Sequence, residues 1–102
     1  MSKKIWALLA GHGGVVNGVY QTAPEKMFIH SPEEVFYEGV SNRIIKDEIM
    51  RLCWDKGIHT IDICPTELDV PLGVRADIVN RYHQEYPNLV GVEIHSNAGK
   101  GE

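Results

Sequence analysis

The sequence has little cysteine, no excess of positive charge and no long apolar run. Its two cysteines, Cys53 and Cys64, fall on a helical face and at a strand end, so we expect two buried thiols and no framework disulfide. The formal net charge is −4 at pH 7, which gives no electrostatic footprint for nucleic acid. No apolar stretch approaches the length that crosses a membrane. We therefore expect no nucleic-acid partner and no membrane partner.

The remaining composition is that of an ordinary globular chain. The 102 residues are 43% hydrophobic and 24% charged, which argues against disorder. Without repeats or linkers, residues 1–102 are expected to form a single domain. Lys3 and Lys4 precede an apolar stretch, as in a signal peptide, but this stretch is short and runs into His12, not into a small-residue cleavage site. We expect no signal peptide and synthesis in the cytoplasm.

Apolar periodicity predicts three strands and two helices in alternation. The strands are expected at residues 4–10, 58–64 and 89–95, and the helices at residues 41–56 and 72–85. Residues 11–37 are predicted to be an irregular functional loop, because glycine and proline punctuate them. The order strand, helix, strand, helix, strand predicts an α/β fold whose mainly parallel sheet is flanked by helices.

The first predicted helix has an apolar stripe at helical spacing. We expect this stripe to face the core: Ile44, Ile45, Ile49, Leu52 and Cys53. Gly57 follows the last periodic residue and is suited to end the helix.

Three residues that lie where elements begin or end are the candidates for function. His12 follows the first predicted strand, Glu38 opens the first helix and His95 closes the last strand. The carboxyl ends of parallel strands share one edge of a sheet, and a following helix starts near that edge. We therefore expect the three side chains to meet at one rim.

The chemistry of this set points to zinc. Two imidazoles and a carboxylate, with a fourth position open, are the ligand set of a catalytic zinc site. Such an ion lowers the pKa of a bound water to roughly 7 and polarises a carbonyl group. Taken singly, each histidine could be an ordinary hydrogen-bonded residue. The negative charge of Glu38 could simply stabilise the N-terminus of the helix through the helix dipole. Taken together, His12, Glu38 and His95 predict one Zn²⁺ per chain.

The other histidines are not expected to be ligands. His30 lies in the loop, His59 starts a strand, and His83 falls on the apolar stripe of the second helix, where we expect it to pack.

Four motifs, in order along essentially the whole chain, carry a resemblance. They are Gly11-His12-Gly13-Gly14, Glu38 followed by Asn42, Arg75 followed by Asn80, and Ile94-His95-Ser96-Asn97-Ala98. The set resembles the zinc-dependent N-acetylmuramoyl-L-alanine amidases of bacteria and phages (amidase type 3). The spacing of Asp69, Leu72 and Arg75 is similar to a further segment of that family.

The resemblance implies a fold, an activity and a partner. The fold is a three-layer α/β/α arrangement. The activity is cleavage of the amide between N-acetylmuramic acid and the L-alanine of the stem peptide, so the partner is peptidoglycan or a muropeptide. His12, Glu38 and His95 fall on the three zinc-ligand positions of the family. With no signal peptide, the chain resembles a phage or prophage lytic enzyme that acts on the cell wall.

The chain departs from the family pattern in its catalytic base. The family places a catalytic glutamate on a strand well beyond the second histidine, whereas Glu102 falls too soon after His95 to be that residue. We expect an amidase domain incomplete on its C-terminal side that carries the metal-binding half of the site. A second chain, a C-terminal segment or self-association is expected to complete it.

Four residues are candidates for contact with substrate or ligands. Glu93 stands where the family often has serine, and by strand alternation it shares a face with His95. It is a candidate for a partner that orients a metal ligand and a weak candidate for the base, unless it faces solvent or pairs with a basic residue. Arg75, Asn42 and Asn97 are expected to position the loops or the substrate.

Two alternatives to an amidase remain open at this point. One is a zinc-containing module that binds peptidoglycan without cutting it. The other is a hydrolase of the zinc carboxypeptidase kind, which also uses His, Glu and His. In those enzymes the first two ligands usually lie within a few residues, whereas His12 and Glu38 are well separated.

Overall fold

The computed structural model describes residues 3–23, 25–31 and 33–96 of the protein. The elements follow one another as β1 (Ile5–Ala10), β2 (Val15–Val16), β3 (Val19–Tyr20), β4 (Met27–Ser31), β5 (Glu34–Tyr37), α1 (Glu38–Asp55), β6 (Thr60–Asp62), α2 (Leu72–Glu85) and β7 (Leu89–Ile94). Both predicted helices and all three predicted strands are present.

A three-stranded parallel sheet forms the centre of the fold. Its strand order is β6-β1-β7, and β1 pairs with β7 along its whole length, from Ile5 opposite Leu89 to Ala10 opposite Ile94. Strand β6 pairs with β1 over only three residues, so the strand predicted at residues 58–64 is shorter than expected. The predicted α/β class and parallel sheet are confirmed.

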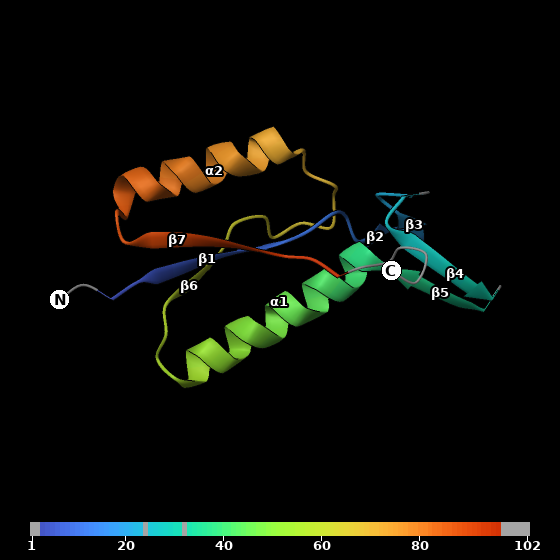
Figure 1. Ribbon diagram of the computed structural model, residues 1–102, viewed down its shortest axis with the longest axis horizontal. Helices are drawn as coiled ribbons and strands as arrows, with labels where there is room; N and C mark the ends of the chain where they lie inside the picture. Colours follow the sequence, from blue (N-terminus) through green and yellow to red (C-terminus); the bar gives the residue numbers. More distant parts are fainter. Residues whose placement is uncertain (1–2, 24, 32, 97–102) are drawn as a thin grey trace.

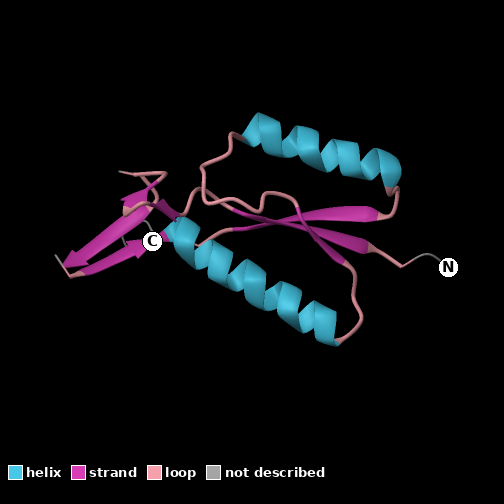
Figure 2. Cartoon of the chain, turned by 180° about the vertical axis from the view of Figure 1, so that it is seen from behind, coloured by secondary structure: helices cyan, strands magenta, loops and turns pink. Residues whose placement is uncertain are grey.

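Strand β1 is buried on both of its faces. Ile5, Ala7 and Leu9 belong to a core cluster against which residues of α2 such as Ile78 and Val79 pack. The alternate residue Leu8, on the opposite face of the strand, is also buried, at 3% exposure. Figures 1 and 2 show α1 and α2 on opposite sides of the strands, which accounts for burial of both faces.

The buried face of α1 differs from the predicted stripe. Ile44, Ile45 and Leu52 are exposed, at 65%, 41% and 44%. The helix instead buries polar residues that find partners inside: Asn42, Arg43 and Lys46. The prediction was wrong because apolar periodicity takes no account of hydrogen bonds that polar side chains make across the fold. Similarly, His83 was expected to pack but is exposed on α2.

Residues 11–37 contain two antiparallel hairpins and are not an irregular loop. In the first, β2 and β3 are joined by Asn17 and Gly18, which have φ of 51° and 79°. These are the left-handed conformations of a type I′ turn, for which Asn-Gly is a preferred pair. The second hairpin, β4–β5, extends away from the sheet beside the start of α1 (Figure 1). The Asn17-Gly18 pair is the signal in the sequence that indicates the first hairpin.

The predicted end of α1 at Gly57 is confirmed. Gly57 has φ of 71° and follows α1, and the next residue, Ile58, donates its N–H to the carbonyl of Cys53, as in a Schellman motif. Cys53 and Cys64 are both free thiols, as predicted, but only Cys64 is buried, whereas Cys53 is half-buried. Burial raises the pKa of the Cys64 thiol. Neither α1 nor α2, the helices in the described ranges, is long and apolar enough to cross a membrane.

Candidate metal site

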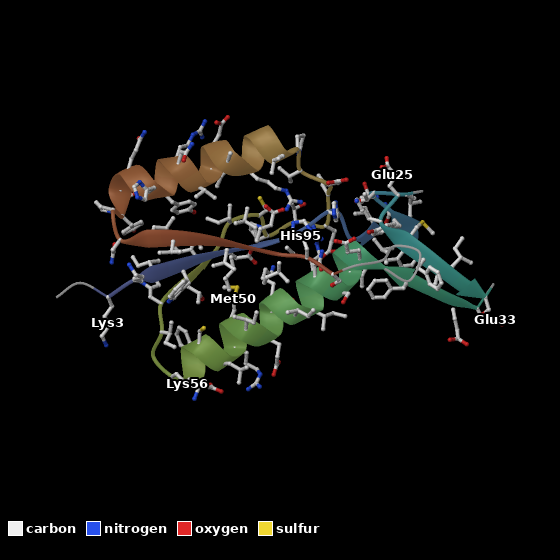
Figure 3. All side chains as sticks on the ribbon, viewed as in Figure 1. Lys3, Glu25, Glu33, Met50, Lys56 and His95 are labelled. Atoms are coloured by element: carbon white, nitrogen blue, oxygen red, sulfur yellow. The ribbon has the colours of Figure 1, made fainter. Side chains whose placement is uncertain are left out.

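His12, Glu38 and His95 meet at the carboxyl end of the sheet. His12 lies two residues after β1, Glu38 is the first residue of α1, and His95 directly follows β7. One ligand atom from each lies within 4.8 Å of one ligand atom from each of the others. Figure 3 shows His95 close to the N-terminal end of α1. The three residues that the sequence placed at one rim are thus neighbours in space, and together they could hold a metal ion.

The geometry around Glu38 suits a tetrahedral ion. Its Oε1 lies 3.4 Å from His12 Nε2 and 3.4 Å from His95 Nδ1. In a tetrahedral zinc site with bonds of roughly 2.0–2.1 Å, neighbouring ligand atoms are about 3.3–3.4 Å apart. The two imidazole rings stand nearly perpendicular, with centroids 5.3 Å apart. The two distances from Glu38 are therefore compatible with a bound metal ion.

The site is buried on one side and open on the other. The Glu38 side chain is 7% exposed, that of His12 is 23% exposed and that of His95 is 49% exposed. Burial lowers the pKa of His12, although the negative charge of Glu38 opposes this change. The neutral imidazole favoured by burial is the form that binds a metal.

Arg75 holds the backbone around His12. The guanidinium is buried and donates to three carbonyl oxygens: those of Ala10 at 2.6 Å, Val70 at 2.8 Å and His12 at 3.1 Å. His12 has φ of 64°, a left-handed conformation that is uncommon for residues other than glycine. Arg75, predicted to position a loop, therefore stabilises an unfavourable backbone conformation at a candidate ligand.

Asn42 connects the glycine motif Gly11-His12-Gly13-Gly14 to the residues that follow β7. The side chain is fully buried, and its Nδ2 donates to the carbonyl of Gly11 at 3.0 Å. Its Oδ1 accepts a hydrogen bond of 2.7 Å from the hydroxyl of Ser96, next to His95. Asn42 thus lies behind the candidate ligands. Asn97, the fourth residue predicted near the site, lies outside the described residues.

Glu93 lies beside His95, as strand alternation predicted. Its Oε1 is 3.0 Å from His95 Nε2 and 3.5 Å from the Arg75 guanidinium. Glu93 lies outside the group of metal-ligand atoms found among the described residues, as do His59 and His83. The side chain of His30 lies outside the described part of the chain.

A cavity of about 440 Å³ adjoins the three candidate ligands His12, Glu38 and His95, referred to as the trio. Its lining combines two candidate ligands, two carboxylates, a buried guanidinium and three apolar residues: His12, His95, Asp69, Glu93, Arg75, Val70, Pro71 and Leu72. The candidate site therefore has room for a substrate on its exposed side.

Sequence reasoning did not identify two residues of the first hairpin region. The Tyr20 hydroxyl donates to the carbonyl of Lys26 and accepts from the N–H of Gly39, in the first turn of α1. The Thr22 hydroxyl accepts from the N–H of Gly13 and donates to Asp69. The Asn-Gly turn is the signal that places Tyr20 and Thr22 beside the glycine motif.

Comparison of the chain with family models, with curated proteins and with solved structures finds no match.

Proposed function

We propose that the protein is a zinc-dependent amide hydrolase that acts on peptidoglycan and cleaves the bond between N-acetylmuramic acid and the L-alanine of the stem peptide. The observation that supports this most directly is the pair of 3.4 Å distances from Glu38 Oε1 to the two histidines. The order of the motifs along the sequence supplies the substrate class.

Different residues of the site would bind the metal, position the backbone and contact the substrate. His12, Glu38 and His95 would hold zinc, which supplies a Lewis acid for the amide carbonyl and a nucleophile at neutral pH. Arg75 and Asn42 keep the glycine motif in place through backbone carbonyls. The adjoining cavity would receive the substrate beside His95.

The resemblance also implies a three-layer α/β/α arrangement and action on the cell wall, and both belong to the proposed function. The helices on opposite sides of the strands support the layer arrangement.

A second candidate is a zinc-containing module that binds peptidoglycan without cutting it. The carboxylates that line the cavity favour it, because each already has a partner. Glu93 contacts His95 and Arg75, and Asp69 accepts a hydrogen bond from Thr22. One oxygen of each carboxylate, Glu93 Oε1 and Asp69 Oδ2, is thus already engaged, which leaves only the second oxygen for general-base catalysis.

Metal analysis of the purified chain tests the site. We expect close to one zinc per chain, and its loss in His12→Ala and His95→Ala. His83→Ala is the matched control, because His83 is exposed on α2 and should leave the stoichiometry unchanged. A wild-type chain that binds no zinc would falsify the proposed function.

Incubation with purified muropeptides separates the two candidates. New free α-amino groups on L-alanine, detected by labelling and mass spectrometry, support the amidase. Binding of uncut muropeptide by the zinc-loaded chain supports the binding module. The Glu38→Gln variant controls for hydrolysis by a contaminating enzyme.

A further inference from the structure

We infer that Glu93 is a positioning residue for the metal site, which holds His95 through its second ring nitrogen. The two nitrogens of this ring face two different carboxylates. Nδ1 is 3.4 Å from Glu38 Oε1, and Nε2 is 3.0 Å from Glu93 Oε1. The inference rests on the zinc site of the proposed function and adds a residue to it.

Binding of zinc at Nδ1 would fix the tautomer of His95. A neutral imidazole carries its proton on one nitrogen and a lone pair on the other. Nδ1 is the nitrogen on the side of Glu38, so zinc bound there would leave the proton on Nε2, whose nitrogen lies 3.0 Å from Glu93 Oε1. A metal-binding histidine characteristically donates its other N–H to such a partner, which fixes the ring orientation and increases its basicity.

Arg75 holds Glu93 in this position. The guanidinium lies 3.5 Å from Glu93 Oε1, and its side chain is only 4% exposed. The same guanidinium donates to the carbonyl oxygens of Ala10 and His12. One buried cation therefore links the backbone of the first candidate ligand to the carboxylate beside the third.

The surroundings of Glu93 distinguish this role from two others. Glu93 is not a ligand itself, since the group of ligand atoms in the described ranges comprises His12, Glu38 and His95. Nor is the carboxylate purely solvated, since its Oε1 contacts both the His95 ring and the Arg75 guanidinium. The carboxylate thus contacts His95 on the side of the cavity.

Zinc titration of Glu93 variants tests the inference. Glu93→Ser removes the acceptor and is expected to weaken zinc binding roughly 10- to 100-fold in a competition assay with a chromophoric chelator. Glu93→Gln keeps an oxygen that can accept the Nε2–H and should restore most of the affinity. Glu34→Ser is the matched control, because Glu34 is an exposed strand glutamate in β5.

Nitrogen NMR completes the test, because a merely structural role of Glu93 would not change which nitrogen of His95 binds zinc. In nitrogen NMR of the zinc-loaded wild type, His95 should be protonated at Nε2 and bound through Nδ1, and Glu93→Ser should lose this preference. Unchanged affinity in Glu93→Ser, or binding through Nε2 in the wild type, overturns the inference while the zinc site stands. Absence of zinc from the wild type overturns both. Zinc binding without cleavage counts against the amidase alone.

Discussion

At the scale of single residues, the candidate ligands depend on neighbours that have no side chain. A Cβ atom on Gly11 would lie 2.5 Å from Cε1 of His95. A Cβ atom on Gly39 would lie 1.7 Å from the carbonyl oxygen of Gly13. Real Cβ atoms do not approach other atoms so closely, so the first glycine admits the imidazole and the second admits the helix that carries Glu38.

Gly11→Ala is therefore expected to displace the His95 ring and to weaken zinc binding at least about tenfold, since ligand orientation controls affinity. Isothermal titration with zinc measures the change. Gly73→Ala is the control, because a Cβ there meets nothing within 4 Å and alanine favours the helix. Equal affinity in Gly11→Ala and the wild type would show that His95 is not held against this glycine.

A buried charge pair beneath α1 offers a second test at this scale. Lys46 Nζ lies 2.7 Å from Asp62 Oδ2, while Asp62 Oδ1 is buried without a partner among the described residues. Lys46→Met would leave the carboxylate unpaired, so we expect a loss of about 1–3 kcal/mol in urea unfolding. Lys46→Met combined with Asp62→Leu should regain much of this loss, because an apolar pair avoids the desolvation cost.

The same pair predicts how stability depends on pH. Burial lowers the pKa of Lys46, but hydrogen bonds to Asp62 and Asp47 outweigh burial and raise the pKa above the ordinary value of 10.5. A raised lysine pKa gives stability that is fully present below the unfolded pKa and is lost as pH rises through the folded pKa. Unfolding free energy should fall above about pH 10.5 in the wild type and fall less in Lys46→Met.

At the scale of elements, the first hairpin fixes the start of α1. Tyr20 closes β3, is buried, and joins Lys26 to Gly39 through its hydroxyl. The N–H of Glu38 is bonded to the carbonyl of Lys26. The N–H groups of Glu38 and Gly39, two free donors of the first helical turn, are thus satisfied by the hairpin region, and the N-cap residue Tyr37 makes no capping hydrogen bond with its side chain.

Tyr20→Phe is expected to remove both hydrogen bonds and to lower stability by about 1–2 kcal/mol, since a buried N–H then lacks a partner. Zinc affinity should fall as well, because Glu38 lies next to Gly39. Thermal unfolding and zinc titration measure the two effects. Tyr86→Phe is the control, because no hydrogen bond of its hydroxyl is found in the described part of the structure. Similar losses in the two variants would count against the role of Tyr20.

The elements also show what sequence patterns could and could not predict. The residue ranges of α2, β1 and β7 followed from apolar periodicity, although the packed face of α2 did not, since His83 is exposed. The buried face of α1 did not, because the partner that Lys46 meets inside the fold is Asp62, which is distant in sequence. The trio could be predicted because its members lie at element ends. The contacts of Tyr20 with Lys26 and Gly39 could not be predicted, since they depend on how the first hairpin lies against the start of α1.

At the scale of the whole molecule, the site joins three distant segments. The strand β1 lies between β6 and β7, and the trio comes from the residues after β1, the start of α1 and the residue after β7. An unfolded chain does not hold these side chains together. Metal binding should therefore favour the folded state.

Zinc is accordingly expected to raise the melting temperature. At free zinc about 100-fold above Kd, the folded state gains about 2.7 kcal/mol, which corresponds to roughly 10 °C or more for a chain of this size. Thermal scans with zinc, with zinc plus chelator, and with magnesium measure the effect. Only zinc alone should shift the transition, because imidazole ligands disfavour magnesium. His12→Ala should melt at the same temperature with and without zinc.

The pairing of β1 with β7 has a consequence for the rate at which the site forms. These two strands come from opposite ends of the described chain, and bringing them together is entropically costly because the contact order is high. His95 reaches His12 and Glu38 only after β7 has joined β1. In a refolding experiment started with zinc present, metal uptake would therefore follow the docking of the last strand, and the bound ion would report when folding is complete.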